Sequence, residues 1–157
     1  MQTTKEPALG AGNMSESGSG GSAMASIRRQ IGITRPAAEV WDALRDVGEL
    51  HTRLVAGFVT DCRLEGDSRV VTFANGMTVR ERIVEISDED QRVVWSATGG
   101  RLSHHNASAQ VRPVTDRSCE VVWVADLLPD ELAPAIADMI EQGLTAMKRT
   151  LESAHAA

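Results

Sequence analysis

The chain has no tyrosine, only two phenylalanines and only two cysteines. Cys62 and Cys119 are too few for a disulfide scaffold and lack the spacing of a metal site, so we expect two small buried thiols. No run of about 18 apolar residues is present, which argues against an integral membrane segment. The N-terminal residues also lack the apolar core of a signal peptide, and we expect a cytoplasmic protein.

Positive charge is scarce as well. Sixteen Lys and Arg residues stand against 22 Asp and Glu residues, for a net charge of −6. The arginines are scattered rather than grouped in a basic patch, so we expect no nucleic-acid partner. The sequence has no glycine-rich phosphate loop, metal cluster or nucleophile motif, and we expect no cofactor and no metal.

The chain divides into a leader and one domain. Residues 1–25 are rich in Gly, Ser and Ala and have no apolar periodicity. Such a segment cannot bury enough surface to offset the entropy of ordering, so we expect a disordered leader, either a native extension or a tag or linker. We expect residues 26–155 to form a single domain.

A long amphipathic helix is predicted at the end of the chain, over about residues 130–154. Its apolar residues repeat at steps of three and four, which places them on one stripe that must pack against another layer. The stripe consists of Ile136, Met139, Ile140, Gly143, Leu144, Met147 and Leu151.

Short strands and turns fill most of the remaining domain. Pro36 suits an early helical position, and Gly48 suits a break between two short helices. Asn75-Gly76 predicts a two-residue turn with positive φ at both positions. We expect strands over residues 26–33, 57–65, 69–74, 77–86, 91–98, 104–112 and 118–127, a helix after Pro36, and a short helix around 49–53.

This order predicts an α+β fold, in which a curved antiparallel seven-stranded sheet grips a long C-terminal helix. Neighbouring strands have no helical crossover between them, so parallel pairing is excluded. A lipocalin-like barrel would not carry two helices after its first strand, and a cone of the nuclear-transport-factor type opens with its helices. A sheet wrapped around a helix tends to leave a pocket, and pockets bind small molecules.

Strand alternation sorts the polar residues. His105 alternates with alanines and a valine and should point inward, whereas His104 should face solvent, which makes an adjacent-histidine metal site improbable. Glu81 shares a face with Met77 and Val79 and is a candidate inward carboxylate, with His105 as its partner. Further inward sets are Val71 with Phe73; Val93, Trp95 and Ala97; and Phe58, Thr60, Cys62 and Leu64.

The last strand allows two registers. Val121, Trp123, Ala125 and Leu127 form the more apolar set, but a shift by one residue would turn Val122, Val124 and Asp126 inward instead. Both alternatives stay open at the level of the sequence.

The segments RPAAEVWDALRDVGEL, ERIVEI, GGRLSHHNAS and LPDELAPAIADMIEQGLTAMKRTLE resemble the START / polyketide cyclase-dehydrase (SRPBCC) superfamily. The resemblance covers residues 26–154 and implies a helix-grip fold with a deep hydrophobic cavity. Members use this cavity for lipid or hormone binding, for transport or for polyketide cyclisation. Glu81 and His105 resemble cavity-lining positions of plant hormone receptors, where the second position is usually an aromatic hydroxyl residue.

These observations lead to two main hypotheses. In the first, which we favour, the cavity binds a small hydrophobic or amphipathic molecule (a lipid, polyketide or aromatic compound), as a carrier or sensor. In the second, the protein is a polyketide cyclase/dehydrase-type enzyme with Glu81 and His105 as an acid-base pair. The expected ligand-binding residues are Phe58, Phe73, Val79, Glu81, Trp95, His105, Trp123, Ile136, Met139 and Gly143.

His51 and Arg53 are expected at the cavity mouth, where they would meet an anionic end of a ligand. A third interpretation is a ligand-gated regulator, in which loops near residues 75–76 or 99–104 close over the ligand and present a surface to a protein partner. A homodimer is a further expectation for the partners of this chain.

Overall fold

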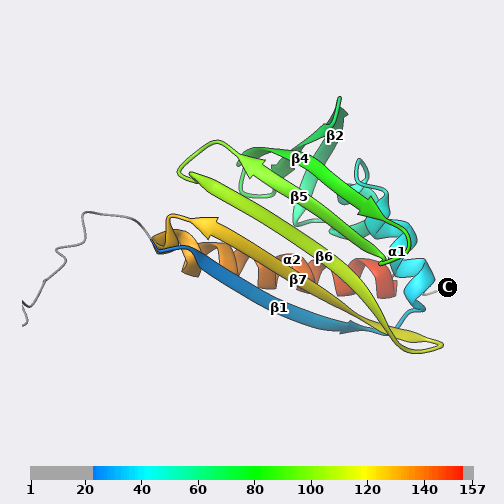
Figure 1. Ribbon diagram of the computed structural model, residues 1–157. Coiled ribbons are helices and arrows are strands. Elements are labelled where there is room, and N and C mark those ends of the chain that lie inside the picture. The colour runs from blue at the N-terminus through cyan, green and yellow to red at the C-terminus, as the bar shows by residue number, and fades with distance from the viewer. Residues whose placement is uncertain (1–22, 154–157) are drawn as a thin grey trace, which may run out of the picture.

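The computed structural model describes residues 23–153, so the predicted leader lies almost entirely outside the described residues. One strand and two short helices precede six consecutive strands, and a long helix comes after them (Figure 1). The elements are β1 (Ala25–Ile33), α1 (Ala37–Arg45), the π-helical turn η1 (Leu50–Leu54), β2 (Val59–Glu65), β3 (Ser68–Phe73), β4 (Thr78–Ser87), β5 (Arg92–Thr98), β6 (His104–Thr115), β7 (Ser118–Leu128), the 3₁₀ turn η2 (Asp130–Leu132) and α2 (Ala133–Ser153).

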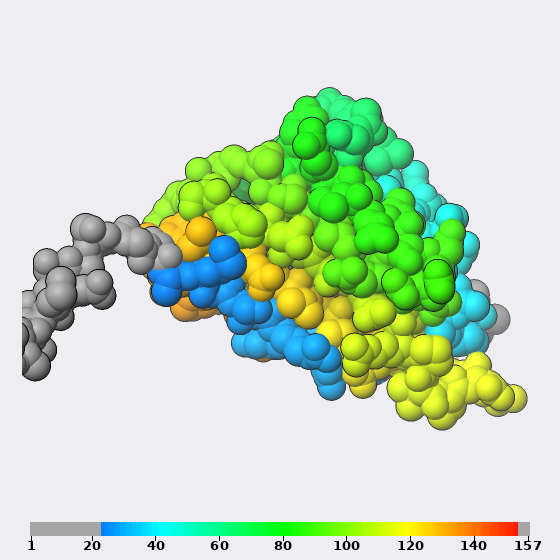
Figure 2. All heavy atoms as spheres, viewed as in Figure 1, coloured from blue at the N-terminus to red at the C-terminus, as the bar shows by residue number. Residues whose placement is uncertain are grey.

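The seven strands form one antiparallel sheet in the order β1-β7-β6-β5-β4-β3-β2. Each strand from β2 to β7 pairs with its neighbour in sequence, and β1 returns to pair with β7. The sheet curves around α2, and the tip of the β6–β7 hairpin projects beyond the body of the molecule (Figures 1 and 2). The predicted helix-grip architecture is confirmed.

The long helix packs on one half of this sheet. Ile140, Leu144, Met147 and Leu151, which belong to the predicted stripe, are all buried. The elements that α2 packs against include β1, β7 and η1. Strands β3 to β5 belong to the other half of the sheet, where the curvature leaves space between the two layers.

The register of β7 is the apolar one. Val121, Ala125 and Leu127 are buried in the core under α2, and Trp123 packs against the same core. Of the two registers that the sequence allowed, the structure therefore has Trp123 inward and Asp126 on the opposite face.

Strand β2 departs from the predicted alternation. A register shift between Val59 and Asp61 lets Val59 and Cys62 both point into the core. Thr60 and Leu64, which were expected inward, are exposed, and 59% of Leu64 is accessible. The prediction for Thr60 was wrong because the β-bulge places Val59, rather than Thr60, on the same side as Cys62. Leu64 shares a face with Cys62 and lies next to Gly48, but on the edge strand β2 most of its side chain stays open to solvent.

The Asn75-Gly76 turn is also longer than predicted. Gly76 has a positive φ of 88°, but Asn75 does not belong to the positive-φ residues. Instead the Asn75 side-chain oxygen accepts a hydrogen bond from the Met77 amide, and the Gly76 amide donates to the Phe73 carbonyl. A loop with a single left-handed glycine satisfies the backbone groups here without a second strained residue.

Helix α1 is tied to the turn between β4 and β5. The Trp41 Nε1 donates to Asp88 Oδ1 at 2.9 Å, and Arg45 Nε donates to the same oxygen at 2.8 Å. The Trp41 hydrogen bond and then the Arg45 guanidinium lower the pKa of Asp88 below its usual range. Trp41 itself is buried, on the apolar face of the helix with Val40 and Leu44.

We expect Gly143→Ala to destabilise the protein although alanine is the better helix former. An added Cβ would lie 2.9 Å from Trp123 Cζ3 and 3.3 Å from Phe58 Cε1. Overpacking of this kind costs about 1–3 kcal/mol and helix propensity returns about 1 kcal/mol, so the expected net loss is about 1 kcal/mol in urea unfolding.

The control is the same substitution in a Trp123→Phe background, where the smaller ring leaves room for the methyl group. There Gly143→Ala should be neutral or stabilising. An equal loss of stability in both backgrounds would show that Trp123 does not limit how closely α2 packs against the sheet.

Candidate functional site

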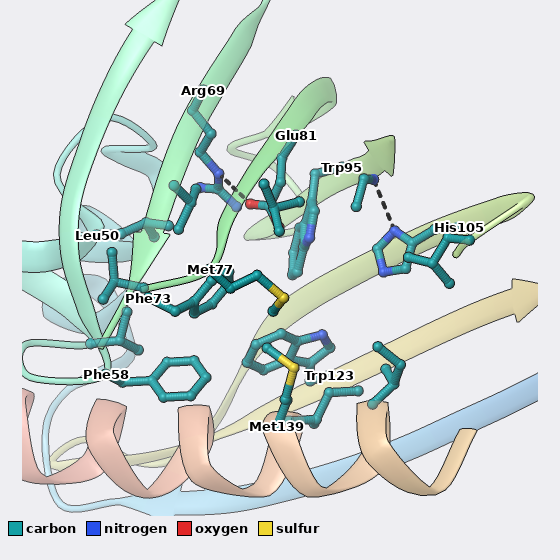
Figure 3. Close-up of a pocket in the computed structure, with 18 of the residues that line it drawn as sticks. Leu50, Phe58, Arg69, Phe73, Met77, Glu81, Trp95, His105, Trp123 and Met139 are labelled. Atoms are coloured by element: carbon teal, nitrogen blue, oxygen red, sulfur yellow. Dashed lines mark hydrogen bonds and ion pairs between the residues drawn. The ribbon is translucent and has the colours of Figure 1, made fainter. Parts of the chain in front are cut away.

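A cavity of about 530 Å³ lies between the concave face of the sheet and α2 (Figure 3). Ligand pockets in proteins typically measure about 300–1,000 Å³ and are mostly apolar with a few polar groups. This cavity has the same character. Its walls come from η1, from strands β2 to β7, from the β5–β6 loop and from α2.

The predicted ligand-binding residues gather around this space. All of them except Gly143 line it directly: Phe58, Phe73, Val79, Glu81, Trp95, His105, Trp123, Ile136 and Met139. Gly143 lies just beneath the lining, because its Cα faces the outer edge of the Trp123 ring and Phe58. Residues that were not among the expected ligand-binding residues complete the walls, among them Leu50, Leu54, Leu102 and Met147.

Two aromatic pairs shape the apolar part. The rings of Phe58 and Phe73 meet edge to face with centroids 5.4 Å apart, and those of Trp95 and Trp123 meet in the same way at 5.5 Å. Edge-to-face packing is a favoured geometry of aromatic pairs, and it fixes the ring orientations. The two aromatic pairs therefore give part of an otherwise mainly aliphatic wall a defined shape.

A buried ion pair forms the first polar feature of the cavity. Arg69 Nε donates to Glu81 Oε1 at 2.8 Å, and the two side chains are only 4% and 11% exposed. Arg69 Nη1 also donates to the Val47 carbonyl, and the guanidinium carbon lies 5.4 Å from the Trp95 ring centroid. The hydrogen bonds and the aromatic face compensate part of the cost of desolvating the charge.

The predicted partner of Glu81 was thus wrong. No hydrogen bond or ion pair joins Glu81 to His105 in residues 23–153, and Arg69 holds the carboxylate instead. Sequence reasoning missed Arg69, although alternation in β3 places it on the same face as Val71 and Phe73. The alternation of β3 is therefore sufficient to predict that Arg69 faces the cavity.

His105 forms the second polar feature, and its partner is the backbone of the neighbouring strand. The β5–β6 ladder ends at the Trp95–Ala107 pair. Beyond that point the Ala97 amide donates to His105 Nδ1 at 2.9 Å, and Ser96 Oγ donates to the His105 carbonyl at 2.5 Å. Because Nδ1 accepts, the proton of the neutral ring lies on Nε2.

Burial lowers the pKa of His105, an effect that Glu81 partly opposes and His104 adds to. Near neutral pH the ring is therefore uncharged. The imidazole lies beside the cavity, with Trp123 and Met139 below it on the side of α2 (Figure 3).

The residues expected at the mouth are elsewhere. Arg53 donates to Asp46 at 2.8 Å and to Asp42 at 2.5 Å, and these two carboxylates raise the pKa of its guanidinium. It lines a separate small surface pocket with Arg35 and Thr150. His51 does not line the cavity either, so the prediction of a mouth built from these two residues was wrong, because η1 turns Arg53 towards α1.

In the described residues, the two cysteines lie in the core rather than at a metal site. Cys62 and Cys119 are free and buried as predicted, and burial raises the pKa of both thiols, that of Cys119 to about 11. Within residues 23–153, no three His, Cys, Asp or Glu side chains are grouped to hold a metal ion. No helix in that range has the length and apolar character needed to cross a membrane.

The chain matches the family model "Polyketide cyclase / dehydrase and lipid transport" over residues 24–152. It belongs to this family. The match spans the whole described domain and agrees with the helix-grip fold. No protein with curated functional information matches the chain.

Solved structures with the same fold come from bacteria and plants. A Thermobifida fusca protein is 26% identical, with a TM-score of 0.67 and coverage of 83% of this chain and 95% of that one. A START superfamily protein from Mycobacterium smegmatis is 8% identical, with a TM-score of 0.70 over 82% and 98% of the two chains. Norcoclaurine synthase from Thalictrum flavum, solved with dopamine and hydroxybenzaldehyde, is 14% identical, with a TM-score of 0.66 over 99% of both chains.

Removal of Arg69 alone should be strongly destabilising. Arg69→Met leaves the Glu81 carboxylate buried without its counter-charge, a change that costs about 3–5 kcal/mol in comparable buried pairs. Urea unfolding of the variant measures the loss.

The control variants for this experiment are Arg29→Met and the double variant Arg69→Met with Glu81→Leu. Arg29 pairs with Glu141 on the surface, where the side chains are 42% and 60% exposed, so the loss should stay below about 1 kcal/mol. The double variant should recover much of the loss because no lone charge remains. If Arg69→Met costs no more than Arg29→Met, the ion pair is not buried in solution.

The contribution of His105 to stability should depend on pH. Its pKa in the folded protein lies below the unfolded value, so the unfolded chain binds more protons between the two values. This contribution is complete above the unfolded pKa and is lost as the pH falls through the folded pKa. His105→Asn keeps an acceptor for the Ala97 amide but does not titrate.

The measurement is the free energy of unfolding of both proteins between about pH 8 and about pH 5, a window around the ordinary histidine pKa of about 6.5. The wild type should lose stability relative to the Asn variant as the pH falls. A difference that does not change with pH would contradict the buried neutral imidazole.

Proposed function

We propose that the domain binds a small hydrophobic or amphipathic molecule in the cavity, as a carrier or sensor of a lipid, polyketide or aromatic compound. The observation that carries the proposal is the mainly apolar cavity of about 530 Å³ next to one buried ion pair and one neutral imidazole. An apolar ligand body would contact the two aromatic pairs and Met139. Its polar end would lie near Glu81 and His105.

The energetics of the walls favour binding. Burial of apolar surface contributes about 25 cal/mol per Å², and aromatic walls that are already ordered lose little entropy when a ligand enters. The polar groups of the cavity are few and held by the protein, so they can orient a ligand without a large rearrangement. Membership in a family described by cyclase, dehydrase and lipid transport activities supports a small-molecule site but does not choose among those roles.

The second hypothesis, acid-base catalysis by Glu81 and His105 as a pair, is less well supported by the geometry. Glu81 is held by Arg69, and the free nitrogen of His105 carries a proton. In this tautomer the imidazole is a hydrogen-bond donor towards the cavity rather than a general base. A donor suits the polar end of a bound ligand, which is the reason we favour binding over this form of catalysis.

Val79→Trp tests the proposal because it fills the cavity from the first residues of β4, close to the preceding turn, where Val79 lines the wall. The neutral fluorescent dye N-phenyl-1-naphthylamine should bind the wild-type protein, and its affinity should fall by at least about tenfold in the variant, equivalent to about 1.4 kcal/mol. The matched control is Val84→Trp, on the same strand but on the opposite, exposed face. Its affinity for the dye should equal that of the wild type.

Two results would refute the proposal. One is a wild-type protein that binds no neutral apolar dye, and the other is equal loss of binding in Val79→Trp and Val84→Trp. Circular dichroism of all three proteins establishes that each is folded.

A further inference from the structure

We infer that the cavity selects a neutral ligand whose polar end is a hydroxyl group, an alcohol or a phenol, over the corresponding carboxylate. This inference rests on the proposed function and names the ligand class of the same site. It is based on three polar side chains, Arg69, Glu81 and His105, which lie side by side across strands β3 to β6 and which we call the row.

The row is set by strand pairing. Arg69 on β3 pairs with Glu81 on β4, and Glu81 pairs with Ala97 on β5. The Ala97 amide in turn donates to the His105 side chain on β6. The carboxylate and the imidazole therefore lie on either side of Ala97, whose methyl group leaves the space between them open to the cavity.

The hydrogen-bonding capacity of the row matches a hydroxyl group. Glu81 Oε1 is occupied by Arg69, whereas Oε2 receives no hydrogen bond from any residue between 23 and 153. His105 Nε2 likewise has no acceptor in that range, while its Nδ1 is occupied. The open positions are thus one acceptor and one donor, and a hydroxyl group both donates and accepts, whereas a carboxylate only accepts.

The net charge of the row also favours a hydroxyl group over a carboxylate. The Arg69 and Glu81 charges balance each other, and His105 is neutral, so this part of the cavity has no net charge. A ligand carboxylate would place a second negative charge beside Glu81 in a site of low dielectric, which is unfavourable.

One further charged residue lines the cavity in the described part of the chain. The Arg101 side chain is 75% exposed and lies 4.0 Å from Glu131, in the loop after β5. A charge so open to solvent is well screened and offers a ligand anion little beyond what water offers.

The test uses three probes with the same bicyclic body: 2-naphthol, 2-naphthoate and unsubstituted naphthalene. Each displaces N-phenyl-1-naphthylamine from the protein near neutral pH, and the displacement gives its affinity. We expect 2-naphthol to bind at least about tenfold more tightly than 2-naphthoate, a factor that one unpaired buried charge easily exceeds. Naphthalene should lie between them.

Charge variants of the row should move this preference in opposite directions. Glu81→Gln leaves the guanidinium unbalanced and should raise the affinity for 2-naphthoate relative to 2-naphthol by about tenfold. Arg69→Gln leaves the carboxylate unbalanced and should lower the relative affinity for 2-naphthoate further. Dye binding and circular dichroism identify the variants that are folded.

A third variant tests the space in the row without changing any charge. Ala97→Val places two methyl groups between Glu81 and His105, so it should weaken 2-naphthol by about tenfold. The affinity for naphthalene, which has no polar group to place there, should stay within about threefold of the wild type. This variant keeps the test decisive if the charge variants do not fold.

The failure of this inference differs from the failure of the proposed function. If no neutral dye binds, the proposed function itself is wrong. If the dye binds but 2-naphthoate binds as tightly as 2-naphthol, the inferred ligand class is wrong, whereas the proposal that the cavity binds an apolar molecule is retained. Loss of such naphthoate binding in Arg101→Gln would place the anion at the loop and would equally overturn the selection by the row.

Discussion

The close approach of α2 to β7 at Gly143 is the constraint on which the rest of the structure depends. With no side chain at this position, the helix backbone packs directly against the edge of the Trp123 ring. The helix is thereby fixed over β1 and β7, at one side of a sheet that continues through five more strands. Because the sheet curves, the strands beyond β6 cannot reach the helix, and the space left between the layers becomes the cavity. The contact between Gly143 and Trp123 therefore accounts both for the position of α2 and for the space that forms the cavity.

The buried ion pair is not explained by stability alone. Moving two charges out of water costs several kcal/mol each, and apolar replacements of similar volume often fold as well or better. Arg69 and Glu81 nevertheless lie at the wall of the cavity, with an aromatic face, a backbone carbonyl and each other as partners. Such an arrangement has a clear use at a binding site, because it presents oriented polar groups without presenting a net charge. This is the physical link between the core and the proposed function.

The sequence was sufficient to predict the fold and most of the residues of the cavity wall. It was not sufficient to predict which groups the polar side chains bind. Period-two alternation placed Glu81, Trp95 and His105 correctly, because facing depends only on strand register. It was wrong at Thr60, where a bulge with no clear sequence signal turns Val59 inward instead, and at Leu64, which stays exposed on the edge strand β2. Arg69 obeyed the same alternation, which places it on the face of Val71 and Phe73, but it was not among the residues predicted to point inward.

Partners are harder to predict because they depend on the separation of strands in space. His105 was expected to meet a charge, yet it bonds to the Ala97 amide at a place where β5 and β6 no longer pair. No local pattern in the sequence marks the end of a ladder. The same is true of Arg53, whose carboxylate partners lie on α1 and at its C-terminal cap rather than at the cavity.

The end of the β5–β6 ladder also explains why the polar groups are in place before any ligand binds. Where two strands separate, their free amides and carbonyls need other partners, and here the side chains of His105 and Ser96 supply them. The imidazole is therefore oriented by the needs of the sheet itself. Its tautomer is fixed by that bond, and so is the donor that it turns to the cavity. A ligand that uses this donor does not have to order the ring, and the part of the binding free energy otherwise lost to ordering is retained.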